Sequence, residues 1–260
     1  MSFAEALGNA TQGLVKEAPM KPVLIIKAGS TYPELIEHYG DFEDWIARGL
    51  GDRCAVQVCD VREPVPLPSP DRIAAVVITG SHAMVTEQAP WMVRLTDWLD
   101  DVITHPAALP VLGICFGHQL LAKLLGGEVG DHPQGMEVGT VALRMASEAA
   151  RDPLFAGLCE QPWGQMVHQQ SVLVAPPEVS VLASNGHDAC QAFRYRQRVW
   201  GCQFHPEFNA DITRAYLQAL RGRSISDQRA ADAMSEVREC PGANEVLSRF
   251  GQLVQDLCAA

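Results

Sequence analysis

Residues 110–127 read PVLGICFGHQLLAKLLGG, and the predicted architecture of the chain depends on them. Val111–Ile114 is an apolar run with the length of a buried strand, and apolar positions at helical spacing follow it as far as Gly126-Gly127. The glycines on both sides of Cys115 permit a tight turn that presents the sulfur at the end of the strand. A helix starting just after Cys115 directs N–H groups at the sulfur and favours the thiolate. The stretch predicts a nucleophile elbow built on cysteine; a buried cysteine between two packing glycines is the alternative.

The length of 260 residues allows one large domain or two small ones. The hydrophobic fraction of 47% is ample for a sizeable core. The net charge is −11 and no lysine or arginine cluster stands out, which argues against a nucleic-acid surface. No apolar run approaches the ~20 residues that span a bilayer, and residues 1–19 lack the pattern of a secretory signal. The eight cysteines show no metal-binding spacing. They indicate reduced thiols, and we expect a cytoplasmic protein that binds no membrane.

The first half of the chain alternates between predicted strands and helices. Apolar runs at Val23–Ile26, Ala55–Val61 and Ile73–Ile78 predict parallel strands, and Trp91–Ile103 has helical spacing. Residues 27–46 exceed the ~2–6 residues usual between a strand and a helix. They either shape a pocket at the end of the first strand or form a structural insertion. This order predicts an α/β sandwich.

After Gly127 the pattern changes to strands separated by turn residues, including one long strand predicted over Gln165–Val174. Helical spacing returns at Ala210–Arg221. The tail from Ile225 reads as two helices split at Cys240-Pro241-Gly242. We therefore divide the chain into an N-terminal arm (1–21), a catalytic domain (22–222) and a helical C-terminal extension (223–260).

A cysteine nucleophile needs a base and a third group that orients the base. Among the eight histidines, His205 closes the predicted strand Trp200–Phe204, and Pro206 and Glu207 follow it. At a spacing of two residues, the carboxylate of Glu207 can hold one ring nitrogen while the other faces the sulfur. Taken alone, a His-x-Glu pattern is more often a surface pair.

Two motifs together resemble a known family. GICFGHQ at 113–119 and GCQFHPEF at 201–208 are similar to the motifs of class I glutamine amidotransferases, which use a Cys-His-Glu triad. The glutaminase domain of GMP synthase and its free-standing relatives are most similar, and the likeness spans about residues 22–220. It implies a flavodoxin-like, three-layer α/β sandwich with a mostly parallel central sheet, a small antiparallel sheet region and a helical C-terminal tail.

The resemblance also implies roles for single residues. Cys115 would be the nucleophile, His205 the general base and acid, and Glu207 the orienting carboxylate. The segment Thr79-Gly80-Ser81 matches the oxyanion strand of the family, with the N–H groups of Ser81 and Phe116 as donors. The positions implied to line the substrate pocket are Gln119, Gly135, Met136, Glu137 and His168. No cofactor and no metal are expected.

Three features depart from the GMP synthase pattern. Residues 168–171 read His-Gln-Gln-Ser where those glutaminases carry His-Gly-Asp, which puts coupling to a synthase in doubt. The loop at 27–46 is longer than theirs. The sequence also contains no Ser-Gly-Gly-x-Asp-Ser loop and no Gly-x-x-x-x-Gly-Lys phosphate cradle, so we expect no ATP-dependent activation of an acceptor by this chain.

Three functions are compatible with these residues. The first is a glutamine amidotransferase that forms a γ-glutamyl thioester from L-glutamine and passes ammonia to a separate synthase subunit. The second is a stand-alone γ-glutamyl peptidase or hydrolase with the same triad. The third, a non-catalytic regulatory subunit, is disfavoured by the joint presence of Cys115, His205 and Glu207. A cysteine-bearing α/β-hydrolase is disfavoured because its acidic residue precedes the histidine in the chain.

Overall fold

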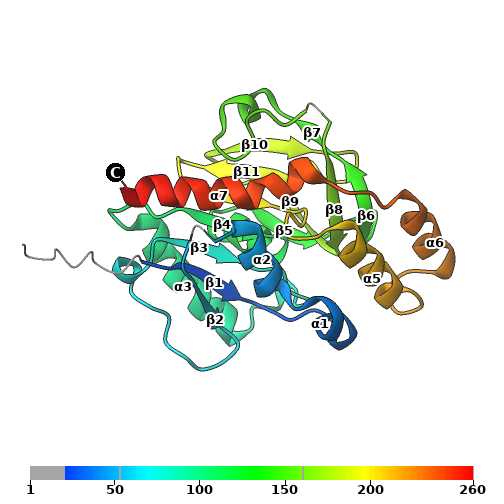
Figure 1. Cartoon of the computed structure of the whole chain (residues 1–260), viewed down its shortest axis with the longest axis horizontal. Coiled ribbons are helices and arrows are strands. Elements are labelled where there is room, and N and C mark those ends of the chain that lie inside the picture. Colours follow the sequence, from blue (N-terminus) through cyan, green and yellow to red (C-terminus); the bar gives the residue numbers. More distant parts are fainter. Residues whose placement is uncertain (1–20, 53, 160, 260) are drawn as a thin grey trace, which may run out of the picture.

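The computed structural model describes residues 21–259 except 53 and 160, so the predicted N-terminal arm lies almost entirely outside the described residues. Its elements follow the alternation expected from the sequence (Figure 1). The elements of the first half are β1 (Val23–Lys27), α1 (Pro33–Tyr39), α2 (Phe42–Leu50), β2 (Val56–Asp60), β3 (Ala75–Ile78), α3 (Pro90–Thr104), β4 (Val111–Ile114) and α4 (Phe116–Leu124).

The second half supplies the remaining strands and three helices. These are β5 (Glu128–Asp131), β6 (Glu137–Ala142), β7 (Arg144–Met145), β8 (Trp163–His168), β9 (Gln170–Val174), β10 (Val179–Ser184), β11 (Ala192–Tyr195), β12 (Val199–Cys202), α5 (Ala210–Leu220), α6 (Asp227–Glu236) and α7 (Pro241–Ala259).

An eight-stranded sheet in the order β2-β1-β3-β4-β12-β11-β10-β7 forms the centre of the molecule. The first five strands in this order pair in parallel, and the last three continue the sheet in antiparallel fashion. The strands that carry the motifs of the site, β3, β4 and β12, are neighbours at its middle. Since parallel strands end at the same edge, the residues that follow these three strands meet there.

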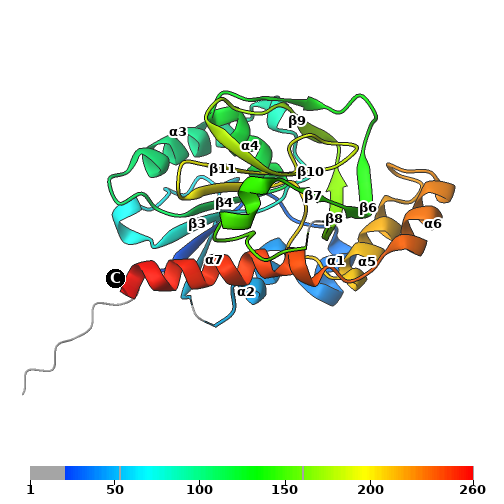
Figure 2. The same cartoon turned by 90° about the horizontal axis from the view of Figure 1, so that it is seen from above.

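Helices cover both faces of this sheet, as Figures 1 and 2 show. Side chains alternate along β1: Val23 and Ile25 pack in one core with α2 and α7, while Leu24 and Ile26 pack in another with α3 and α4. A strand buried on both faces needs a continuous apolar run, which is the pattern that predicted it. The predicted mostly parallel α/β sandwich is confirmed.

Two small antiparallel sheets, β5–β9 and β6–β8, stand beside the central sheet. The long strand predicted over Gln165–Val174 is wrong in one respect, because the chain is interrupted at Gln169. The residues before the interruption pair with β6 and those after it with β5. Alternating apolar residues predicted the extended backbone on both sides, but the change of pairing partner depends on contacts distant in sequence.

The tail forms the two predicted helices. One face of α7 is buried through Val246, Leu247 and Phe250 in the core shared with α2 and β1. In contrast, α6 buries only Ala230 and lies against α5 and β6. Among the described residues, no helix combines the length and the apolar character needed to cross a bilayer.

Candidate active site

Cys115 lies between β4 and α4 with φ 50° and ψ −99°, in the left-handed half of backbone space that side chains rarely adopt. The turn is possible because the neighbouring backbones approach closely. A Cβ atom on Gly117 would lie 2.7 Å from the carbonyl oxygen of Ile78 in β3. Such a strained residue at a strand end, 6% exposed, has the geometry of a nucleophile elbow.

His205 follows β12, the strand beside β4, and forms a buried pair with Glu207. Nδ1 of His205 lies 2.7 Å from Oε1 of Glu207. The other ring nitrogen, Nε2, is buried and meets no oxygen or nitrogen partner among the described residues. The ring therefore has one nitrogen held by a carboxylate and one left for the sulfur of Cys115.

The charge of His205 follows from these neighbours. Burial lowers the pKa of His205, but the carboxylate of Glu207 and the thiolate of Cys115 outweigh burial and raise this pKa to about 10. The imidazolium form therefore prevails at neutral pH. An imidazolium held between a carboxylate and a cysteine is the arrangement that activates a sulfur nucleophile.

An aromatic stack holds the imidazole ring in place. The ring of Phe208 lies 4.1 Å from that of His205 and the ring of Phe42 lies 6.2 Å from it, both in stacked orientation. A Cβ atom on Gly80 would lie 3.1 Å from Cε1 of His205. The histidine is thus packed between α2, the segment after β3 and the segment that leads into α5, and its imidazole has little freedom to rotate.

The segment Thr79-Gly80-Ser81 leaves β3 beside the end of β1. The N–H of Ala28 donates to Oγ1 of Thr79 at 3.0 Å, and the hydroxyl of Ser81 donates to the carbonyl of Ala28 at 2.9 Å. Ser81 and Phe116 both line the cavity in front of Cys115. Phe116 is the first residue of α4, and the first N–H groups of a helix have no partner within it.

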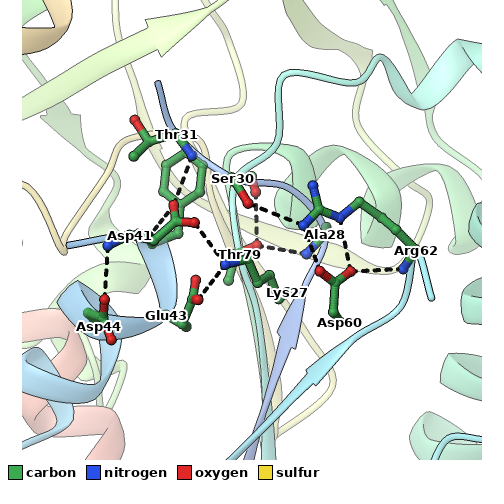
Figure 3. Close-up of polar contacts among 12 residues, drawn as sticks. Lys27, Ala28, Ser30, Thr31, Asp41, Glu43, Asp44, Asp60, Arg62 and Thr79 are labelled. Carbon is green, nitrogen blue, oxygen red and sulfur yellow. Dashed lines mark hydrogen bonds and ion pairs between the residues drawn. The ribbon is translucent and has the colours of Figure 1, made fainter. Parts of the chain in front are cut away.

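An ion-pair cluster lies around Lys27, the last residue of β1 (Figure 3). The ammonium of Lys27 lies between Asp41, 2.8 Å away, and Glu43. Asp41 also accepts from the N–H of Thr31 at 2.8 Å and from that of Phe42 at 2.9 Å, which makes it the N-cap of α2. Burial raises the pKa of Asp41, but Lys27 and these N–H donors outweigh it and lower the pKa.

We expect Asp41→Ala to lower the free energy of unfolding by about 2–3 kcal/mol, because it removes the N-cap and one partner of a half-buried lysine. It should also reduce activity, since α2 carries Phe42 onto His205. Urea unfolding at neutral pH measures the loss. Because the carboxyl has a lowered pKa, its contribution is present above its unfolded pKa and disappears as the pH falls through the folded one. The exposed Asp100→Ala should stay within about 0.5 kcal/mol of the parent; equal losses would contradict the assignment.

A cavity of about 150 Å³ opens in front of Cys115. Among the described residues that line it, none is an aspartate, glutamate, lysine or arginine. Aromatic side chains border one part of it: Tyr32 and His82 have ring centroids 4.6 Å apart, and Nε2 of His82 lies 3.1 Å from the hydroxyl of Tyr216. The residues lining the cavity are Tyr32, Ser81, His82, Ala83, Met84, Cys115, Phe116, Gln119, Met136, Val167, His168, Gln169, Gln170, Tyr216, Leu220 and Ser224.

Two glutamines on the cavity wall have amides with fixed orientations. Nε2 of Gln119 donates to the carbonyl of Gln170 at 2.6 Å and to Oε1 of Gln203 at 2.9 Å. Nε2 of Gln170 donates to Thr86 at 2.8 Å and to Asp131 at 3.2 Å. Both N–H bonds of each amide are used, so each side chain has only its oxygen left. The wall therefore offers hydrogen-bond acceptors, and Oε1 of Gln170 is buried without a partner among the described residues.

The other predicted pocket residues occupy different depths. Met136 and His168 line the cavity, whereas Glu137 lies behind His168, with its Oε2 2.9 Å from Nε2 of that ring. Gly135 does not line the cavity and has φ 77°, in a turn that favours glycine. The loop thus contributes Met136 to the cavity and Glu137 to its support.

A family model described as glutamine amidotransferase class-I matches residues 34–219. The chain belongs to this family. The match contains β4, α4, β12 and every residue of the elbow and of the His205–Glu207 pair. The predicted division into domains at residues 22 and 222 stays a prediction, because the match bears on the family and not on independent folding.

Other members of the class I glutamine amidotransferase family are similar over much of this chain. A glutamine amidotransferase-like protein of Schizosaccharomyces pombe is 26% identical over 87% of this chain and 95% of its own length. Gamma-glutamyl peptidase 5 of Arabidopsis thaliana is 29% identical over 65% of this chain and 67% of its own length. A glutamine-hydrolysing GMP synthase of Symbiobacterium thermophilum is 29% identical over 87% of this chain, but over only 44% of its own length.

The fold of this chain also matches a solved structure. The crystal structure of a glutamine amido transferase from Methylobacillus flagellatus aligns with a TM-score of 0.69 at 24% identity, covering 92% of this chain and 94% of that one. This likeness concerns the fold alone.

Some cavity residues of this amidotransferase were not predicted from the sequence. Tyr32 precedes α1 in the extended segment after β1, and Tyr216 lies on α5 among apolar residues that read as core. His82 directly follows the oxyanion segment, a position that could have identified it. Gln170 had a signal in the departure from His-Gly-Asp at 168–171, but its hydrogen bonds to Thr86 and Asp131 involve distant segments.

Proposed function

We propose that the protein hydrolyses the γ-amide of L-glutamine through a cysteinyl γ-glutamyl thioester and releases ammonia and glutamate. One observation carries the proposal: a strained elbow cysteine faces a cavity beside a buried histidine whose only nitrogen without an oxygen or nitrogen partner is Nε2. A non-catalytic subunit would have no need of the strained Cys115 or of a buried His205–Glu207 pair.

Binding of the amino-acid end follows from the acceptors on the wall. The α-ammonium group of glutamine carries only donors, while Gln119 and Gln170 both line the cavity and each has only its side-chain oxygen left as an acceptor. Neutral amides suit this role in a site where no described lining residue is an aspartate, glutamate, lysine or arginine. The side chain of the substrate then extends toward Cys115.

The thiolate of Cys115 attacks the γ-carbonyl carbon, and the carbonyl oxygen becomes an oxyanion. The N–H groups of Ser81 and Phe116 donate to it, a contribution of about 3–4 kcal/mol per donor in acyl-transfer enzymes. As the C–N bond breaks, Nε2–H of His205 protonates the departing ammonia, and the thioester remains on Cys115. Neutral His205 then takes a proton from water, which attacks the thioester and releases glutamate.

A γ-glutamyl peptidase activity is the second candidate. The part of the cavity nearest the aromatic stack of His205 is bordered by Tyr32, His82 and Tyr216. Because His205 protonates the leaving group, an amine larger than ammonia would lie against these rings. The relative named a gamma-glutamyl peptidase supports this reading.

A panel of substrates distinguishes the two. Purified protein is incubated with L-glutamine and with γ-glutamyl dipeptides, and released glutamate is measured. Hydrolysis of glutamine in preference to dipeptides supports a glutaminase, and its ammonia would then be used by a separate synthase subunit. Preference for dipeptides supports the peptidase. Absence of turnover of either, together with no labelling of Cys115 by a glutamine-mimicking electrophile, rejects both.

A further inference from the structure

A second buried histidine–glutamate pair lies at the cavity, which His168 lines. Glu137 is 7% exposed and His168 4%, and the two residues are direct partners in the register of β6 and β8. Nε2 of His168 lies 2.9 Å from Oε2 of Glu137. The reaction described above uses neither residue.

Both ring nitrogens of His168 face acceptors. Nδ1 lies 3.0 Å from the backbone carbonyl oxygen of Gln170, which can only accept. The hydroxyl of Ser171 is farther from Nδ1, at 3.4 Å, so a lone pair on Nδ1 would face the carbonyl at close range. Nδ1 therefore carries a proton. A second proton must lie between Nε2 and Oε2, since two lone pairs at 2.9 Å would repel each other.

The surroundings of Glu137 place this second proton on the histidine. Oε1 accepts from the amide of Asn185 at 2.7 Å, and Oε2 accepts from the amide of Gln191 at 2.8 Å. The orientation of Asn185 is fixed because its own oxygen accepts two backbone N–H groups. Donors on both oxygens favour the carboxylate. His168 is then an imidazolium.

The pair supports the substrate wall through one carbonyl group. The carbonyl of Gln170 accepts from Nδ1 of His168 and also from the amide of Gln119. His168 stands where the chain leaves the β6–β8 sheet for the β5–β9 sheet, and the carbonyl oxygen of the preceding residue, Val167, lies 3.7 Å from the sulfur of Cys115. The two ring protons of His168 thus fix the turn at Gln169, which orients Gln119 and places Gln170 in the cavity wall.

We propose that Glu137 and His168 are positioning residues, and that a permanently protonated His168 fixes the amide-lined wall that holds the amino-acid end of the substrate. The effect of these two residues on kinetics rests on the proposed function, whereas the charge of His168 does not. If His168 lost one of its two ring protons, the lone pair of that nitrogen would face the oxygen of Gln170 or of Glu137. The wall would shift, and substrate binding would weaken more than the chemical step at Cys115.

Other titratable groups surround the pair. The ring of His187, in the loop after β10, lies 5.9 Å from that of His168 and 3.9 Å from that of His132, to which it is tilted. Burial lowers the pKa of His187, and burial also lowers that of the enclosed His118 on α4 to about 4. Both are neutral at neutral pH and compete little for the proton. Asp188 follows His187 and adds a carboxylate to this side.

Two measurements test the proposal. Long-range ¹H–¹⁵N spectra of the wild-type protein at neutral pH, with the His168 signals assigned by comparison with His168→Gln, should show both ring nitrogens protonated, because each faces an oxygen acceptor. One unprotonated ring nitrogen at neutral pH would overturn the proposal. This readout requires no substrate, so it stands apart from the proposed function.

The kinetic arm compares Glu137→Gln with Glu148→Gln, an exposed glutamate in the turn Ser147–Arg151. Glu137→Gln should raise KM by about tenfold or more and change kcat by less than about threefold. Glu148→Gln should match the parent. An unchanged KM in a folded Glu137→Gln protein overturns the positioning role. If the wild-type protein turns over no γ-glutamyl substrate, the proposed function fails and the spectra alone decide the charge of His168.

Discussion

Cys115→Ala should reduce glutamate release from the preferred substrate by at least about 10⁴-fold, because without the sulfur no thioester forms and only the binding groups act. The elbow itself should persist. Alanine keeps the Cβ atom already present at φ 50°, and the glycines that permit the turn are unchanged. The thermal unfolding temperature of the variant should therefore stay close to that of the parent.

The intermediate provides a direct measurement. Hydroxylamine added during turnover attacks the thioester carbonyl, breaks the C–S bond and forms a γ-glutamyl hydroxamate, which the wild-type protein should produce and Cys115→Ala should not. The matched control is Cys159→Ala, because Cys159 is exposed and the proposed reaction gives it no role. Turnover of Cys115→Ala at the parental rate would reject the nucleophile, and an equal loss in Cys159→Ala would point to thiol damage instead.

The other buried cysteines explain why only one position is expected to react in the cavity. Burial raises the pKa of Cys190 and of Cys240 to about 12, and raises that of Cys202 well above its ordinary value. These side chains are neutral thiols inside the cores. Labelling by a glutamine-mimicking electrophile should therefore map to Cys115 among the buried cysteines.

The central part of the fold could be predicted from sequence because burial on both faces leaves a local pattern. Val23–Ile26 and Val111–Ile114 are continuous apolar runs, and each is a strand of the parallel sheet. The turn at Cys115 could also be predicted locally, because the Gly-x-Cys-x-Gly pattern that permits it spans only five residues. His205 and Glu207 could be selected as candidates because they follow a predicted strand and flank Pro206, and the roles predicted for them came from the family resemblance.

What escaped prediction depends on segments far apart in the chain. The connection at residues 27–46 was expected to be long, but the sequence did not show what it does. The ammonium of Lys27 pairs with Asp41 and Glu43, and these ion pairs hold α2 beside the segment Thr79-Gly80-Ser81. Glu137 was expected at the pocket surface. Its three partners come from β8, the loop after β10 and the residue before β11, and only the folded chain shows that Glu137 lies behind His168.

The second large effect concerns the base. Replacing His205 with asparagine should lower kcat by about 10²–10⁴-fold, since no group then protonates the leaving amine or activates water. His168→Asn is the matched comparison, because both nitrogens of His168 are occupied by protein oxygens and it should affect KM more than kcat. A mild effect of His205→Asn with a severe loss of kcat in His168→Asn would exchange the two assignments.

Glu207→Gln tests how the charge of His205 is maintained. The carboxylate of Glu207 helps to raise the pKa of His205 to about 10, so the imidazolium that protonates the leaving group is lost only in strongly alkaline solution. Glutamine removes the negative charge, the pKa of His205 falls, and the alkaline limb of kcat/KM should move toward neutral pH. A limb that stays in place after Glu207→Gln would mean that the thiolate alone holds the proton on His205, and the carboxylate would then serve only to orient the ring.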